Sequence, residues 1–447
     1  MSDTIAAVAT ASGVGSVAIV RLSGGGALDI ARKLTNKSSL IPRHAHLCNL
    51  YDSNDELIDE AIVIWFKAPH SFTTEDVVEF QCHGGSIVAE EILRTVLAYG
   101  ARLAEPGEFT RRAFVGGRID LTEAEAIAKL IEAKSEDAAK ILARQMKGEL
   151  KTFVDTMRDK LIRAVAFAEV TIDYAEEDLP ADLVDNLLHQ LETMEEQIET
   201  IVRSSERRRG LIEGFKVAII GKPNVGKSSL LNALLNYERA IVSEVAGTTR
   251  DTIEEQIRIG THLVRIVDTA GIRESADTIE KIGIARSVAA IEQSDIVIAM
   301  FDASRQWDEE DEQILTLIER YAEEKEMIVV VNKTDLPRKL DIAKIETYSP
   351  LFLSREKKGE EMIDALEKRL SHMAQGDEIL LISSRQIEAV KEARRAISQA
   401  KQPLEMGELE LFAFHLNDAI KAISSISKPV DFNDIMDKMF GEFCLGK

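Results

Sequence analysis

The stretch Lys216-Val-Ala-Ile-Ile-Gly-Lys-Pro-Asn-Val-Gly-Lys-Ser-Ser229 decides the fold of the second half of the chain. Its apolar, β-branched start predicts a buried strand over Lys216 to Ile220, and a helix is expected from Ser229. Between them, Gly221 to Ser228 match the pattern GxxxxGK[ST] of a phosphate-binding loop, whose glycines let backbone amides approach phosphate oxygens. The helix N-terminus that follows favours the same negative charge. The stretch therefore predicts a nucleotide-binding α/β domain.

Two later motifs each follow a predicted strand. Asp268-Thr-Ala-Gly271 follows Leu263 to Val267, where an Asp can hold the Mg²⁺ shell and a glycine amide can sense the γ-phosphate. Asn332-Lys-Thr-Asp335 follows Met327 to Val331. The carboxylate of Asp335 accepts hydrogen bonds from N1–H and the 2-amino group of guanine, and adenine offers neither donor arrangement. These elements, in this order, resemble the small GTPase superfamily and predict selectivity for guanine.

The residues next to the phosphates carry the expected chemistry. Lys227 reaches the β and γ oxygens, and the hydroxyl of Ser228 binds Mg²⁺. Gly247-Thr-Thr-Arg-Asp251 supplies a switch loop in which Thr249 completes the Mg²⁺ coordination when the γ-phosphate is present. Lys227, Thr249 and a group that orients water are therefore the expected catalytic set.

At two positions the sequence lacks a group that other GTPases use in catalysis, and nearby residues offer a replacement. Ile272 occupies the position of the glutamine that orients the attacking water in Ras-like proteins, and an aliphatic side chain cannot do so. Glu280 is the nearest carboxylate for that task, with a solvated helix residue as the other interpretation. Asn224, with the carbonyl groups of Ser243 and Val245, is suited to a monovalent cation where other GTPases insert an arginine.

Ser354-Arg355 is a short motif where a further loop would touch the base. The complete set of residues predicted to contact GTP is Asn224, Val225, Gly226, Lys227, Ser228, Ser229, Ser243, Glu244, Val245, Ala246, Gly247, Thr248, Thr249, Asp268, Thr269, Ala270, Gly271, Asn332, Lys333, Asp335, Ser354 and Arg355.

Charge limits the kinds of partner. The formal net charge of -22 argues against a broad cationic surface that neutralises many phosphates. Arg203 with Arg207, Arg208 and Arg209 is the candidate for a local RNA-binding patch. The alternative interpretation, which is the more common one for a run of charges, is a solvated helix end before a domain boundary.

The cysteines and the apolar segments indicate a compartment. Cys48, Cys82 and Cys444 are scattered without a CxxC pair, so neither a disulfide framework nor a zinc ribbon is expected. The apolar stretch Ile5 to Val20 follows Asp3 instead of a basic region, and no run is long enough to span a bilayer. A cytoplasmic protein is expected.

The chain divides into three predicted domains. Residues 1–118 mix short alternating strands with glycine-rich turns and read as an α+β domain. Residues 119–212 and 376–447 carry amphipathic helical patterns and are expected to pack together as one helical domain. Residues 213–375 alternate strands and helices, which predicts an inserted Ras-like G domain with a mostly parallel sheet.

Further motifs extend from one end of the chain to the other. They are Asp3-Thr4-Ile5, Val20-Arg-Leu-Ser-Gly24, Gln81-Cys-His-Gly-Gly85, Pro106-Gly-Glu-Phe-Thr110 and Phe443-Cys-Leu-Gly-Lys447, beside Gly247 to Asp251 in the G domain. With them, the whole chain resembles the tRNA-modification GTPase family called MnmE or TrmE. Two departures are Gly116-Gly117-Arg118, where the family usually shows an Asn and a Lys-type position, and Arg355, which replaces a small Ala.

The resemblance implies ligands for particular residues. The N-terminal domain would bind 5-formyl- or 5,10-methylene-tetrahydrofolate through Arg21, Glu79, Arg118 and Lys447. K⁺ would be held by Asn224, Ser243, Val245 and Thr248. Mg²⁺ would be held by Ser228 and Thr249, and Glu280 would orient the water.

The resemblance also implies partners and a reaction. It implies a homodimer formed through the N-terminal domains and a complex with the flavoprotein MnmG (GidA). The FAD would be bound by this partner and not by the chain itself. The expected activity is GTP hydrolysis that drives addition of aminomethyl or carboxymethylaminomethyl groups to C5 of the wobble uridine of certain tRNAs. The alternative is a GTP-dependent binding switch in RNA or ribosome assembly without modification chemistry. Cys444 is either a thiol nucleophile or a buried structural cysteine.

Overall fold

The computed structural model describes residues 3–11, 13–173, 181–236, 255–267, 280–355, 358–376, 379–428 and 446. The chain forms two compact units. The first comprises residues 1–129, 145–194 and 388–447, and the second comprises 130–144 and 195–387. The three-domain division with boundaries at 118, 212 and 375 stays a prediction.

The N-terminal part of the first unit is built on a six-stranded sheet in the order β3-β4-β5-β2-β1-β6. All neighbours are antiparallel except β1 and β6, which run parallel. Its strands are β1 (Ile5–Val8), β2 (Val17–Ser23), β3 (His46–Tyr51), β4 (Leu57–Phe66), β5 (Val77–His83) and β6 (Arg102–Leu103). Its helices are α1 (Ala27–Thr35), α2 (Ser86–Ala98) and α3 (Glu108–Val115).

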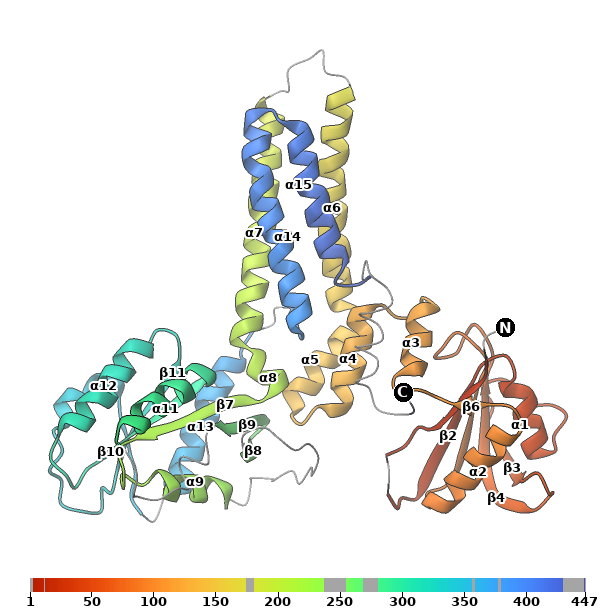
Figure 1. Ribbon diagram of the computed structural model, residues 1–447, viewed down its shortest axis with the longest axis horizontal. Coiled ribbons are helices and arrows are strands. Elements are labelled where there is room, and N and C mark those ends of the chain that lie inside the picture. Colours follow the sequence, from red (N-terminus) through yellow and green to blue (C-terminus); the bar gives the residue numbers. More distant parts are fainter. Residues whose placement is uncertain are drawn as a thin grey trace. The chain divides into compact units, whose positions relative to one another are not determined.

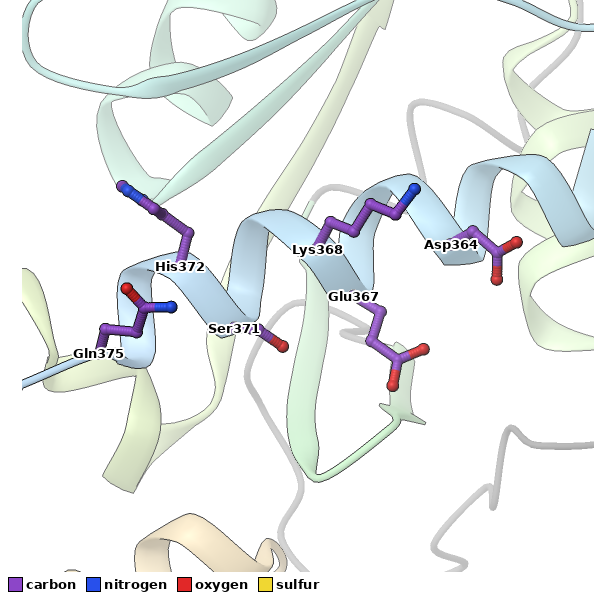
Figure 2. A pocket seen from close by; sticks show the side chains of 6 residues that line it. All are labelled: Asp364, Glu367, Lys368, Ser371, His372 and Gln375. Carbon is purple, nitrogen blue, oxygen red and sulfur yellow. The ribbon is translucent and has the colours of Figure 1, made fainter.

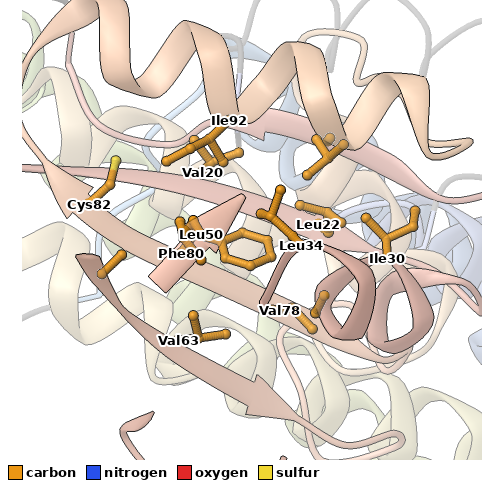
Figure 3. Close-up of a cluster of buried hydrophobic side chains, with 14 of the residues drawn as sticks. Val20, Leu22, Ile30, Leu34, Leu50, Val63, Val78, Phe80, Cys82 and Ile92 are labelled. Atoms are coloured by element: carbon orange, nitrogen blue, oxygen red, sulfur yellow. The ribbon is translucent and has the colours of Figure 1, made fainter. Parts of the chain in front are cut away.

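One face of this sheet and helices α1 and α2 enclose a hydrophobic core (Figure 3). Alternate residues of β2 enter it, and both Val20 and Leu22 are fully buried, as period-two alternation requires. Phe80 of β5 and Ile92 of α2 are fully buried in the same cluster. The predicted α+β architecture of the first 118 residues is therefore observed.

The helical segments are α4 (Leu121–Glu132), α5 (Glu136–Met146), α6 (Glu149–Asp173), α7 (Ala181–Arg207), α8 (Arg209–Glu213), α14 (Ser384–Met406) and α15 (Leu409–Ser424). In the first unit α15 packs along α6 (Figure 1), as the helical patterns predict. Leu150, Val154, Met157 and Leu161 form a buried stripe on α6 at helical spacing. In the described segments, no helix has both the length and the apolar character needed to cross a membrane.

The second unit contains a second six-stranded sheet in the order β12-β11-β10-β7-β9-β8. It is parallel except for the β8–β9 hairpin. Its strands are β7 (Phe215–Gly221), β8 (Glu255–Ile259), β9 (His262–Val267), β10 (Ile296–Asp302), β11 (Glu326–Asn332) and β12 (Leu351–Phe352). Its helices are α9 (Lys227–Leu235), α11 (Glu280–Gln293), α12 (Glu309–Tyr321) and α13 (Lys358–Ala374), with 3₁₀ turns η1 (Ile342–Lys344) and η2 (Glu346–Tyr348).

The sheet brings three chain segments to one edge. Every residue of β10 is buried, and β10 lies between β7 and β11, so this central strand has no solvent-facing side. In the parallel register Met300 pairs with Gly221, and Asp302 pairs with Asn332. The carboxyl ends of β7, β10 and β11 therefore meet, which is where open α/β sheets bind ligands.

The predicted strand positions are confirmed, but the start of one helix is wrong. The helix after the phosphate loop begins at Lys227 instead of Ser229. Gly226 precedes it with a φ of 109°, and its carbonyl oxygen accepts the first helical hydrogen bond from Leu230 at 2.9 Å. Lys227 and Ser228 thus belong to the first helical turn, where unpaired amides favour an anion.

Candidate nucleotide-binding site

The phosphate loop has a backbone that its sequence makes possible. Gly221 has a φ of 148°, and a Cβ there would lie 2.7 Å from the carbonyl oxygen of Met300 on β10. Glycine is required because any side chain would collide with that strand. Asn224 is exposed and adopts a left-handed φ of 63°, whereas Val225 beside it is buried. The loop therefore leaves the sheet tightly and presents its middle to solvent.

The side chain of Lys227 forms hydrogen bonds with the backbone of the phosphate loop. Its Nζ donates to the carbonyl oxygens of Gly221 at 2.7 Å and Lys222 at 3.0 Å. Burial lowers the pKa of Lys227 from its ordinary value, because desolvation disfavours the ammonium ion, while Glu310 acts in the opposite direction. Phosphate oxygens bound at the loop would therefore compete strongly with these two carbonyl oxygens for hydrogen bonds from the Lys227 amine.

Two side chains of the predicted base-reading motif join the phosphate loop directly. Asn332 is buried, and its Nδ2 donates to the carbonyl oxygen of Val225 at 2.7 Å. Lys333 donates from Nζ to the carbonyl oxygen of Asn224 at 2.8 Å. The phosphate loop and the loop that ends at the exposed Asp335 are thus fixed to each other.

The weak Ser354-Arg355 motif lies beside the same loop. Leu353 donates its N–H to Val331 at 2.9 Å, and its carbonyl oxygen accepts from the Thr334 hydroxyl at 3.0 Å. These bonds hold the segment after β12 against the residues that precede Asp335. The structure therefore brings both predicted base-side segments together.

Asp302, the last residue of β10, belongs to no sequence motif and was not predicted as a site residue. Its side chain is 1% exposed, and its Oδ2 accepts from Nζ of Lys333 at 2.6 Å. Oδ1 accepts from the backbone N–H of Ser304 at 2.9 Å and from its hydroxyl at 2.6 Å. Burial would raise the pKa of Asp302, but the Lys333 and Ser304 hydrogen bonds hold it below its ordinary value. A buried, ionised carboxylate thus holds Lys333.

The variant Asp302→Asn is expected to weaken GTP binding about tenfold, because one charge-assisted hydrogen bond to Lys333 is lost and an amide donor replaces it. Nucleotide titration of the full chain measures the change. The matched control is Glu312→Gln, since Glu312 pairs with Lys344 at 2.8 Å on the exposed surface of the same unit. Its loss should leave the affinity unchanged. Equal affinity of Asp302→Asn and the unaltered chain would contradict a role for Asp302.

Several predicted residues lie outside the described part of the chain. They are Ser243, Glu244, Val245, Ala246, Gly247, Thr248, Thr249, Asp268, Thr269, Ala270, Gly271, Cys444 and Lys447. Helix α11 begins at Glu280, whose side chain is likewise outside the description. The predicted switch loop, the Asp268-Thr-Ala-Gly271 motif and the water-orienting carboxylate therefore stay predictions.

Three of the four residues predicted to bind folate have described contacts in the N-terminal part. Arg21 of β2 pairs with Glu79 of β5 at 2.8 Å and lies over the ring of Phe109 at 5.7 Å. Arg118 donates to the carbonyl oxygen of Ser71 at 2.5 Å and lies over the ring of Phe72 at 5.9 Å. Phe72 packs against the cluster that contains Phe109, so the two guanidinium groups stand over neighbouring aromatic rings.

Gly446, the described residue near the C-terminus, lies against the end of β1. Gly446 has a φ of 95°, and a Cβ there would lie 2.3 Å from the carbonyl oxygen of Val8. Val8 pairs with Val20, the residue before Arg21. Only glycine fits this contact, which holds Gly446 at the end of β1.

The candidate RNA-binding patch is not a continuous basic surface. Arg208 is buried and donates to the carbonyl oxygen of Gly376 at 2.6 Å. Arg203 pairs with Glu199 at 3.5 Å, and Arg209 pairs with Glu213 at 2.9 Å. The buried Arg208 thus serves the packing after α7, and carboxylates partly neutralise the charges of Arg203 and Arg209.

Cys82 and His83 are adjacent in sequence, and we expect a turn or packing role for them instead of a shared metal ion; the structure gives each side chain a different partner. Cys82 is buried, and its thiol donates to the carbonyl oxygen of Ala18 at 3.4 Å. His83 lies with Nδ1 2.7 Å from Asp59. Within the described ranges no group of three or more His, Cys, Asp or Glu residues could hold a metal ion.

A surface hollow of about 530 Å³ lies along α13 (Figure 2). Its lining residues are Asp364, Glu367, Lys368, Ser371, His372 and Gln375. The labelled side chains come from α13 and from Gln375 directly after it, and they point in different directions, so they do not converge on a common ligand. The phosphate loop contributes nothing to it, and the hollow is not the nucleotide site.

Comparison with known proteins places the chain in a family. The model of the MnmE helical domain matches residues 121–444, and the model of the GTP-binding protein TrmE N-terminus matches residues 4–118. Curated relatives named tRNA modification GTPase MnmE are 63% identical in Sulfurovum sp., 60% in Sulfurimonas denitrificans and 63% in Nitratiruptor sp.. Each alignment covers 100% of this chain and 99% of the relative.

Among solved structures, Era in complex with MgGDPNP and nucleotides of 16S ribosomal RNA is 28% identical over 41% of this chain and 66% of that chain. Its TM-score of 0.27 is too low to support an argument about the fold. The family models and the full-length relatives are sufficient: this chain belongs to the MnmE (TrmE) family of tRNA modification GTPases.

Proposed function

We propose that the chain hydrolyses GTP at the loop Gly221 to Ser228 and uses this cycle to drive modification of C5 of the wobble uridine in certain tRNAs. The observation that carries the GTP site is the direct connection between the phosphate loop and the base-reading loop through Asn332 and Lys333. That connection fixes the distance between triphosphate and guanine, which a GTP-specific site requires. The relatives' name supports tRNA as the substrate class.

The exposed residues of the loop fit the proposed ions. Asn224 offers a side-chain oxygen and Ser228 a hydroxyl, and both are exposed. Oxygen donors of this kind suit Mg²⁺ and K⁺. Ser228 with Thr249 would hold Mg²⁺, and Asn224 with Ser243, Val245 and Thr248 would hold K⁺. The ions would supply positive charge opposite the triphosphate.

We further propose that the N-terminal part binds a formyl- or methylene-tetrahydrofolate. The support is that Arg21 and Arg118 lie over the neighbouring rings of Phe109 and Phe72, and that Gly446, which precedes Lys447 in sequence, lies at the end of β1. In this proposal the chain is a cytoplasmic homodimer that acts with the flavoprotein MnmG (GidA), which brings the FAD.

Nucleoside mass spectrometry of tRNA tests the modification role. In a strain that lacks the gene, modified wobble uridines should disappear and return when the gene is restored. Unchanged wobble uridines would refute the modification role. That result, with GTP hydrolysis intact in the purified chain, would favour the GTP-dependent assembly switch.

The proposed K⁺ site predicts ion-dependent hydrolysis. GTP turnover in K⁺ should exceed turnover in Na⁺ at equal ionic strength by about tenfold or more, because an ion of the right size offsets developing charge. The variant Asn224→Ala should remove most of the difference. The control Asn232→Ala alters an asparagine later in α9 and should retain it. Equal turnover in the two salts would remove Asn224 from this role.

A further inference from the structure

Lys222, the second residue of the phosphate loop, is buried although Pro223 and Asn224, which follow it, are exposed. Its side chain is 3% exposed, and Nζ donates to Oδ2 of Asp308 at 2.7 Å and to Oδ2 of Asp311 at 2.6 Å. Burial acts to lower the pKa of Lys222, but the hydrogen bonds to these carboxylates raise it above its ordinary value. The ammonium ion is therefore engaged by protein carboxylates.

The two carboxylates belong to the N-terminus of α12 and are themselves fixed. Asp308 is the N-cap, and its Oδ1 accepts from the backbone N–H of Asp311 at 3.1 Å. The backbone N–H of Asp308 donates back to Oδ2 of Asp311 at 3.3 Å, which completes a capping box. Asp311 is 1% exposed, and α12 buries Ile314 and Ile318 in the core. This helix end is thus a rigid support.

The backbone of Lys222 carries contacts that matter for the loop. Its carbonyl oxygen accepts from Nζ of Lys227 at 3.0 Å and from the backbone N–H of Val225 at 3.4 Å. The side chain of the same residue is anchored on α12. Since Asn332 and Lys333 hold the middle of the loop, Lys222 supplies a separate attachment for its first turn.

We propose that Lys222 is a positioning residue for GTP binding and hydrolysis, which fixes the first turn of the phosphate loop by its ion pairs with Asp308 and Asp311. This inference rests on the GTP site proposed above. Lys222 acts through the loop backbone and through charge: without its ammonium ion, two carboxylates would stand unneutralised behind the loop that receives the triphosphate.

The test is titration of the full-length chain in Mg²⁺ and K⁺ with fluorescently labelled GDP and GTP. The variant Lys222→Met should weaken the binding of both nucleotides about tenfold or more, because the loop that cradles them loses an anchor. The preference for guanine over adenine should stay, since the base-reading loop keeps its contacts. The matched control is Lys344→Met, which removes a lysine that pairs with Glu312 of the same helix at 2.8 Å.

A second variant separates positioning from a general loss of stability. Lys222→Met combined with Asp308→Asn and Asp311→Asn removes all three charges, and asparagine remains a good N-cap. Its melting temperature should recover above that of Lys222→Met, while its nucleotide affinity should stay about tenfold or more below that of the unaltered chain. Unaltered affinity in either variant would overturn the positioning role. Failure of the unaltered chain to bind nucleotide would instead reject the GTP site itself.

Discussion

Replacing Asp335 by asparagine is expected to lower the affinity for GTP by a factor on the order of 10⁴ and to raise that for xanthosine triphosphate. The carboxylate accepts from N1–H and the 2-amino group of guanine, whereas an amide places a donor against one of these donors. Xanthine has a carbonyl oxygen at that position and accepts from the amide. Asp335 is exposed, and Lys333 and Thr334 before it fix its loop.

Competition of the two triphosphates for the full chain measures this change. The control is Asp341→Asn, an exposed aspartate later in the same segment whose Oδ1 accepts from the backbone of Ala343 at 3.3 Å. Its substitution should leave the preference for GTP intact. If Asp335→Asn also retained its preference for GTP, the assignment of the base reader would be wrong.

The variant Lys227→Met should reduce the turnover number for GTP by about 100-fold or more, because a preorganised positive charge at the β and γ oxygens is removed. The structure places this amine on the carbonyl oxygens of Gly221 and Lys222, at the loop that would receive those oxygens. Lys227 is half-buried, and this burial lowers its pKa; partial removal of water strengthens the interaction of its charge with phosphate oxygens.

Single-turnover hydrolysis at saturating GTP measures the effect without interference from weaker binding. Lys368→Met on α13 is the control, since Lys368 is an exposed lysine of the same unit and does not belong to the phosphate loop. Its turnover should equal that of the unaltered chain. A Lys227→Met variant that turned over GTP at the unaltered rate would remove Lys227 from catalysis.

The parallel sheet was predictable from particular runs. Three β-branched stretches define β7, β9 and β11, and the structure differs from their predicted limits by a single residue at the ends. The start of α9 was less predictable. Gly226 belongs to the loop pattern in the sequence. In the structure it is the N-cap of α9, and its carbonyl oxygen accepts the first helical hydrogen bond.

The candidate site was predictable where a motif is continuous along the chain. Asn332 and Lys333 were identified in this way, and their hydrogen bonds to the phosphate loop confirm that the two motifs meet. Asp302 and Asp311 were missed because neither belongs to a motif. Each pairs with a lysine far away in sequence, 31 residues in one case and 89 in the other. The fold of the sheet and of the helix α12 after β10 brings such partners together.

The account depends most on one claim: the loop Gly221 to Ser228, joined to the loop that ends at Asp335, forms a guanine-selective triphosphate site. Equilibrium binding of labelled GTP to the purified full chain in Mg²⁺ and K⁺ tests it most directly. The account predicts that the label is retained, that excess GDP displaces it and that excess ATP does not. Failure to retain the label, or equal displacement by ATP, would contradict the account.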